Sequence, residues 1–359
     1  MRLPGHGGHS PLDAFAFDIG PRQLPSVVLA ALASLCFGAV LGPEAPLIAI
    51  GTSVGALLAG RFGGDPQTMM VVGALAAMGA VFGNPVITMV LLLEVALVGG
   101  TRVARPAVLL PCLAGLATGY LLQIGVGDWT GLGTTQLSVP GLPAYAAVRV
   151  VDLLLATALA AAMAAVTLLA LRLAGRLRDL SRGSPVAVLL ASGATVGVVA
   201  AAAQAIEGVG PDLVLFSGQG SMSDYLAPMA VGTALVVGAA KFVAFVASIG
   251  GGFRGGLIFP VIALSTLVAG QVGAGLDSGA QAALMAAAIG AAAAVGTRMP
   301  FTAVLLGALL TAPAGPAVTV FAIIGALVGM LASMLAAPAG HPRGTGRVRS
   351  EVGRGGRLR

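Results

Sequence analysis

The chain has 359 residues, of which 57% are hydrophobic and only 9% are charged, and its formal net charge is +6. Because soluble domains carry about 25% charged residues, this composition excludes an ordinary soluble protein. It predicts an all-α polytopic protein of the lipid bilayer, with roughly ten to twelve embedded helices of about 20 residues each.

The charge and the cysteines narrow the class further. The basic segment 338–359 carries most of the excess charge, so we expect no nucleic-acid partner. Cys36 and Cys112 lie in apolar runs without a CxxC motif or a Cys/His cluster, so we expect neither a metal nor a cofactor. No Ser/His or paired-Asp constellation falls inside the apolar runs, which argues against an intramembrane enzyme.

Apolar stretches separated by Gly, Pro and charged residues predict the order of the helices. Residues 1–24 form a polar segment in which we expect no cleavable signal peptide. Helices are then predicted at about 25–41, 45–60, 66–81, 85–99, 104–124 and 148–176. A second series is predicted at about 186–206, 225–248, 260–275, 279–296, 300–311 and 316–337.

We divide the chain into four parts. The polar segment 1–24 is followed by a first membrane repeat, 25–184, which ends in a basic hinge at 172–184. A second repeat spans 185–337, and residues 338–359 form a basic tail that we expect to be disordered. The distribution of basic residues predicts that the hinge and the tail are cytoplasmic and that loops 125–147 and 207–224 lie outside.

The joint between the first two predicted helices carries an acid inside apolar sequence. Gly42 and Pro43 end one helix, and Pro46 fits the first turn of the next. Glu44 is therefore expected at a helix N-terminus at membrane depth, where a carboxylate is costly and marks a functional site by default. Because free N–H groups there favour anions, we predict that Glu44 occupies an anion site as a gate and leaves it on protonation. The alternative is an acid that only satisfies the amides of its own first turn.

The two halves of the sequence resemble each other. The run Pro46-Leu-Ile-Ala-Ile-Gly51 matches Pro260-Val-Ile-Ala-Leu-Ser265, and about forty residues later Asn84-Pro85 matches Met299-Pro300 before similar apolar runs. Repeats with interrupted helices in corresponding positions predict a substrate site at the repeat interface near the membrane midplane. We therefore expect the joints at 42–46 and 255–260 to face one another.

At these joints the chain resembles the CLC family of chloride channels and chloride/proton exchangers. The family signature Gly-Lys/Arg-Glu-Gly-Pro reads Gly42-Pro43-Glu44-Ala45-Pro46 here. The signature Gly-x-Phe-x-Pro reads Gly256-Leu257-Ile258-Phe259-Pro260, and Gly-Ser-Gly-Ile-Pro matches Gly7–Pro11 only in its first and last residues. The resemblance extends over residues 5–337.

The resemblance implies a fold, an assembly and a set of site residues. The fold is the CLC-type inverted repeat of tilted and broken helices, in a homodimer of the cell membrane whose subunits each hold an anion pathway. Glu44 corresponds to the gating glutamate, and the backbone N–H groups of Leu257 and Ile258 line the central anion site. The other residues that the resemblance assigns to anion contacts are Gly42, Ala45, Gly256, Phe259, Gly8, His9 and Ser10.

The sequence also departs from the family pattern. Gly8 stands where family members offer a serine, no tyrosine follows Tyr225, and the stretch that the resemblance assigns to an internal acid, Leu121–Gly125, contains none. These departures favour passive or weakly proton-linked chloride flow. The alternatives are a chloride/proton antiporter, a pathway selective for fluoride or nitrate, and an inactive truncated product.

Two further charged residues lie within apolar runs. Glu94 ends the run that follows Pro85, and we expect it to be a structural or interfacial acid. Lys241 lies in the run 225–248, where pairing with an acid or snorkelling to the interface is the expectation.

Overall fold

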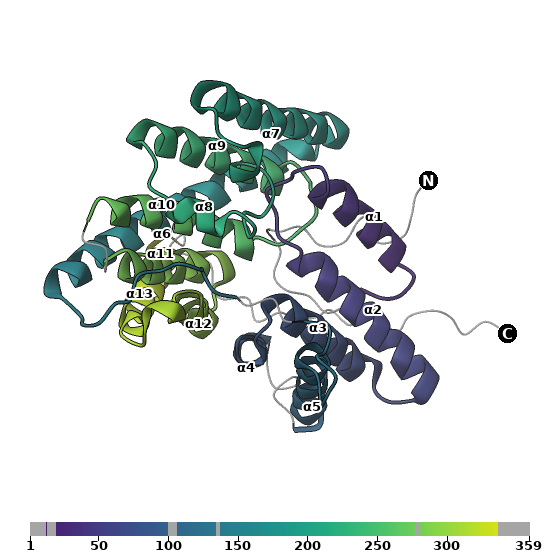
Figure 1. Ribbon diagram of the computed structural model, residues 1–359. Coiled ribbons are helices and arrows are strands. Elements are labelled where there is room, and N and C mark those ends of the chain that lie inside the picture. The colour runs from purple at the N-terminus through teal and green to yellow at the C-terminus, as the bar shows by residue number, and fades with distance from the viewer. Residues whose placement is uncertain (1–11, 13–18, 100–105, 134–136, 277–279, 337–359) are drawn as a thin grey trace.

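The computed structural model describes residues 12, 19–99, 106–133, 137–276 and 280–336. Within these ranges the chain forms thirteen α-helices and two short 3₁₀ helices, and extended pairing is limited to isolated bridges. Seven of the helices are long and apolar enough to cross a membrane. The predicted all-α polytopic class is confirmed (Figure 1).

The helices of the first half lie together in Figure 1, beside those of the second half. They are α1 (Leu24–Leu35), α2 (Glu44–Phe62), α3 (Pro66–Phe82), α4 (Pro85–Gly99) and α5 (Pro106–Ile124). The remaining helices are α6 (Val150–Ser181), α7 (Pro185–Glu207), α8 (Met222–Leu226), α9 (Val231–Gly250), α10 (Ile258–Ala274), α11 (Ala280–Thr297), α12 (Pro300–Leu310) and α13 (Val318–Ala336). The 3₁₀ helices η1 (Pro211–Leu213) and η2 (Ala312–Ala314) lie in connections.

Three predicted segments differ from the structure. The helix predicted at 25–41 ends at Leu35, because Gly38 takes a positive φ of 89° and the chain continues without helix to Pro43. The helix predicted at 225–248 begins only at Val231, after the short α8 and Pro228. The predicted hinge is mostly helix, since α6 continues to Ser181.

The internal repeat is confirmed by packing. In the first half α3 packs against α2, α4 and α5, and in the second half α11 packs in the same way against α10, α12 and α13. The prolines keep their register, because Pro46 and Pro260 are the third residues of α2 and α10. Pro85 and Pro300 each begin a helix, α4 and α12.

The packing of α6 bears on where the repeats divide. This helix packs mainly against α11, α13 and α9, which all belong to the second half. Its buried face is made of small side chains, among them Ala156, Ala160 and Ala164. This packing favours a boundary before α6, and the division of the chain into parts stays a prediction.

Small residues build the centre of the second half. The helix α11 is almost entirely buried and is surrounded by α6, α10, α12 and α13. Gly325 of α13 lies so close to the backbone of Ala287 that a side chain there would collide with it. Such close backbone contact replaces the hydrophobic driving force that is missing between helices in lipid.

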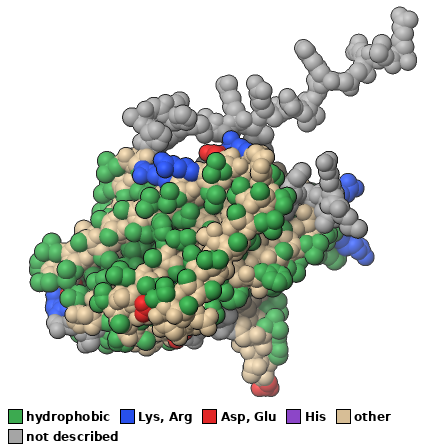
Figure 2. Space-filling model, turned by 90° about the horizontal axis from the view of Figure 1, so that it is seen from above, with side chains coloured by type: hydrophobic (Ala, Val, Ile, Leu, Met, Phe, Trp, Pro, Cys, Tyr) green, Lys and Arg blue, Asp and Glu red, His purple; other side chains and the backbone are tan. Residues whose placement is uncertain are grey.

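The outer surface is suited to lipid. Figure 2 shows a face dominated by hydrophobic side chains and backbone, with the few charged side chains mostly near its edges. Large apolar side chains such as Leu154, Val186 and Leu190 are each more than two-thirds exposed. In water such a surface would aggregate, whereas in a bilayer it is the expected exterior of a spanning helix bundle.

Candidate anion site

The two joints meet, as the repeat predicted. The N–H of Gly42 donates to the carbonyl oxygen of Gly256 over 2.7 Å, and the N–H of Gly256 donates to the carbonyl oxygen of Gly42 over 2.6 Å. This antiparallel bridge links the residues just before α2 to those just before α10. The N-termini of the two broken helices are therefore held side by side.

The non-helical segment 36–43 reaches this position along the second half of the chain. The N–H of Phe216 donates to the carbonyl oxygen of Gly38 over 3.2 Å. The N–H of Val40 donates to the hydroxyl oxygen of Ser248 over 2.9 Å. The second half thus fixes the segment that leads into Glu44, an arrangement that sequence reasoning missed. The available signal was Ser248, the single serine of α9, which lies on its buried face and could have indicated a polar partner there.

Glu44 is the first residue of α2 and is only 1% exposed. Its Oε1 accepts a hydrogen bond of 3.0 Å from the N–H of Phe259 in the first turn of α10. Its Oε2 is buried and has no hydrogen-bond partner among the described residues. The carboxylate thus occupies the N-terminus of α10, where free amides and the helix dipole favour an anion.

Two glycines make room for this carboxylate. A Cβ atom added to either Gly42 or Gly256 would collide with the carboxyl group of Glu44. Because the two glycines also form the bridge between the joints, the backbone itself makes the walls around the carboxyl group. This close approach explains why both signatures need glycine at these positions.

The other predicted site residues fall into three groups. The amide of Phe259, one of the predicted residues, makes the 3.0 Å hydrogen bond to the carboxylate, the amide of Ile258 also interacts with it, and Leu257 directly precedes α10. Ala45 follows Glu44 in the first turn of α2 and is half-buried. Gly8, His9 and Ser10 lie outside the described residues, as does the basic tail. The structure brings together Gly42, Glu44, Gly256 and Phe259.

Glu94 makes a second contact between the halves. Its Oε1 accepts from the N–H of Phe301 over 2.7 Å, and its Oε2 accepts from the N–H of Thr302 over 2.7 Å and from the Thr302 hydroxyl. The side chain is 4% exposed and joins α4 to the N-terminus of α12. These contacts fit the structural alternative of the expectation rather than the interfacial one.

Lys241 has partners other than those predicted. Its Nζ is buried and donates to the carbonyl oxygens of Leu213 and Val214, over 3.4 and 3.3 Å, rather than to a carboxylate among the described residues. It also lies 5.6 Å from the centre of the Tyr225 ring. The ammonium group therefore holds the loop whose Phe216 contacts Gly38.

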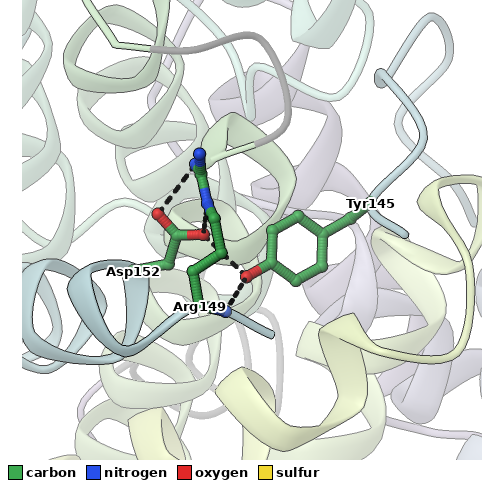
Figure 3. Close-up of polar contacts among 3 residues, drawn as sticks. All are labelled: Tyr145, Arg149 and Asp152. Carbon is green, nitrogen blue, oxygen red and sulfur yellow. Dashed lines mark hydrogen bonds and ion pairs between the residues drawn. The ribbon is translucent and has the colours of Figure 1, made fainter. Parts of the chain in front are cut away.

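A third polar cluster, in which Tyr145 and Asp152 are buried and Arg149 is exposed, lies at the start of α6 (Figure 3). The Tyr145 hydroxyl donates to Asp152 Oδ2 over 2.7 Å, and Arg149 makes two hydrogen bonds to the same carboxylate, of 2.8 and 3.0 Å. Burial and the adjacent carboxylate raise the pKa of Tyr145, so the hydroxyl stays a donor. Because both oxygens of Asp152 are bonded and its charge is neutralised, we assign this cluster to structure.

This geometry defines a class of protein. Broken helices from two repeats, whose N-termini meet at a buried acid, are the architecture of a membrane transport protein. Residues 5–336 match the family described as "Voltage gated chloride channel", and the chain belongs to that family. It is a multi-pass integral membrane protein of an ion-transport family, not of a family of enzymes.

Curated relatives agree with this class. The chain is 27% identical over 273 residues to "Putative ion-transport protein YfeO" of Salmonella schwarzengrund (strain CVM19633) and to the same protein of Salmonella newport (strain SL254). The match covers 72% of this chain and 61% of each relative. The chain thus spans less than two thirds of the length of these relatives.

Solved structures share the fold. A slow cyanobacterial Cl−/H+ antiporter superimposes with a TM-score of 0.71 at 19% identity, over 93% of this chain and 79% of that one. A CLC-type fluoride/proton antiporter superimposes with a TM-score of 0.64 at 20% identity, over 89% of this chain and 76% of that one. The predicted CLC-type fold is confirmed.

Proposed function

We propose that the chain transports small anions, chloride by default, along a pathway gated by Glu44, in a channel-like or weakly proton-linked manner. The observation that carries the proposal is the Glu44 carboxylate bound to the Phe259 amide, while its second oxygen has no hydrogen-bond partner in the part of the chain that the structure describes. A carboxylate bound at a helix N-terminus competes with any other anion for the same amide. Glu44 is therefore placed to close the pathway by occupying it.

Opening follows from the same contact. An arriving anion displaces the carboxylate from the Phe259 amide, or protonation removes the charge that holds Glu44 there. Backbone amides bind an anion without a fixed cation, so the ion is held weakly enough to leave again. The contacts proposed for the open state are Gly42, Ala45, Gly256, Leu257, Ile258 and Phe259.

A coupled chloride/proton antiporter is the second candidate, and a fluoride- or nitrate-selective pathway is a variant of either. The buried, unpartnered oxygen of Glu44 favours coupling, because it offers a proton a place inside the membrane. Two antiporters, one for chloride and one for fluoride, share the fold. The absence of an acid from Leu121–Gly125 favours the leading proposal instead. In both cases we propose a homodimer with one pathway in each subunit.

The test is anion efflux from liposomes that contain the purified protein, with internal pH recorded at the same time. Wild type is compared with Glu44→Gln, and Asp128→Asn, in an exposed loop, is the matched acid-to-amide control. We expect chloride efflux without proton uptake and a several-fold change in rate only in the Glu44 variant. Uphill proton movement that is driven by chloride and lost in Glu44→Gln would show that the protein is an antiporter rather than a channel. Folded protein without efflux of any tested anion would support the alternative that the chain is an inactive truncated product.

A further inference from the structure

An apolar groove lies on the second half, away from the Glu44 joint. It has a volume of about 410 Å³ and is formed by α6, α7 and α9. Its lining includes two apolar residues from each helix, namely Leu173, Leu177, Val188, Ala191, Phe242 and Val246. Concave apolar sites of this volume are of the size that binds a small ligand or one chain of a larger one.

The position of the groove decides where its occupant comes from. The α7 residues Val186 and Leu190, which flank Val188, are each 68% exposed and have the character of a lipid-facing surface. In Figure 1, α7 and α9 lie at the edge of the molecule, and Figure 2 shows the apolar face that includes them. An occupant therefore arrives from the hydrocarbon phase rather than from water.

Basic residues lie beside the α6 side of the groove. In α6, Arg176 lies three residues after Leu173 and is its neighbour on the helix surface, Arg172 lies one turn before Arg176, and both arginines are exposed. Residues 172–184 hold four arginines and one acid, Asp179, a net charge of 4 − 1 = +3. Asp179 pairs with Arg182 over 3.3 Å, both well exposed.

We propose that this groove binds one anionic phospholipid, with an acyl chain against Leu173, Ala191 and Phe242 and the phosphate at Arg172 and Arg176. The arginine stems extend along the apolar surface, and the guanidinium groups reach the headgroup level. Basic pockets between spanning helices bind anionic headgroups in this way, and a zwitterionic headgroup lacks the net charge that they attract. This site is separate from the proposed anion pathway and does not depend on it.

The experiment uses the purified full chain in a non-ionic detergent, with dioleoyl phosphatidylglycerol or dioleoyl phosphatidylcholine added. Native mass spectrometry counts the retained lipids, and thermal unfolding gives Tm. We expect one retained phosphatidylglycerol per chain, at about tenfold higher occupancy than phosphatidylcholine, together with a higher Tm. Ala191→Trp, which fills the groove, and the double variant Arg172→Gln/Arg176→Gln are each expected to abolish both effects.

Matched controls separate this site from general lipid contact. Ala201→Trp is an exposed position further along α7, and Arg61→Gln is an exposed arginine in the last turn of α2. Both controls are expected to retain the lipid and the Tm shift. Equal retention of the two lipids, or equal loss in the control variants, overturns the proposal. So does full retention in Ala191→Trp.

Discussion

The two buried glutamates of the first half, Glu44 and Glu94, differ in how their carboxylate oxygens are hydrogen-bonded. Both accept from the N-terminus of a second-half helix, Glu44 from α10 and Glu94 from α12. Glu94 has three donors and both of its oxygens are bonded, whereas Oε2 of Glu44 has no hydrogen-bond partner among the described residues. Each charge-assisted bond contributes about 1.5–3 kcal/mol, so Glu94 is fixed while Glu44 is held loosely enough to move.

At the residue scale, Gly256→Ala tests whether the glycine walls hold the carboxyl group in place. The added methyl group collides with the carboxyl end of Glu44, a flexible side chain that is expected to move away. We predict a folded protein whose anion efflux changes in the same direction as in Glu44→Gln, by several-fold. Liposome efflux measures this effect.

The control for this variant is Gly60→Ala, also in an apolar helix. A Cβ atom there meets nothing within 4 Å. Wild-type efflux in Gly256→Ala would show that the position of the carboxyl group does not limit transport.

At the element scale, local sequence explains the helices but not their long-range contacts. Pro85 and Pro300 predicted the starts of α4 and α12, because proline fits the first helical turn. The early end of α1 depends on the backbone of segment 36–43, which bonds to residues far along the chain. The spacing of the repeat predicted that the joints meet. The family resemblance already placed Phe259 among the anion contacts, but it did not show that the Phe259 amide donates to Glu44 itself, since that contact depends on how the two joints are packed.

Also at the element scale, Ser248 is predicted to position Glu44, the proposed gate. Ser248→Ala leaves the buried N–H of Val40 without its partner, which costs about 1–3 kcal/mol of stability. If Ser248 positions Glu44, the loosened segment 36–43 changes the pH dependence of efflux in this variant. If Ser248 has a purely structural role, the variant lowers Tm and leaves that pH dependence unchanged. Ser248→Thr keeps the hydroxyl and is expected to restore both properties.

At the scale of the whole molecule, the site exists only where the halves join. The bridge between Gly42 and Gly256 and the contacts of Glu44 and Glu94 all pair a first-half residue with a second-half residue. Neither half alone holds both the carboxylate and its amide. We therefore expect the proposed anion transport from a chain cut into two pieces only if the pieces reassemble.

Where such a cut is tolerated depends on α6. Because α6 packs mainly on α9, α11 and α13, a cut after Gly133 leaves it with its partners, while a cut after Gly183 separates it from them. We predict that co-expressed fragments 1–133 and 134–359 co-purify and restore efflux several-fold better than fragments 1–183 and 184–359. Co-purification yield and liposome efflux measure the difference. Better reassembly of the second pair would instead place the boundary of the repeats at residue 184, since α6 would then fold with the first half.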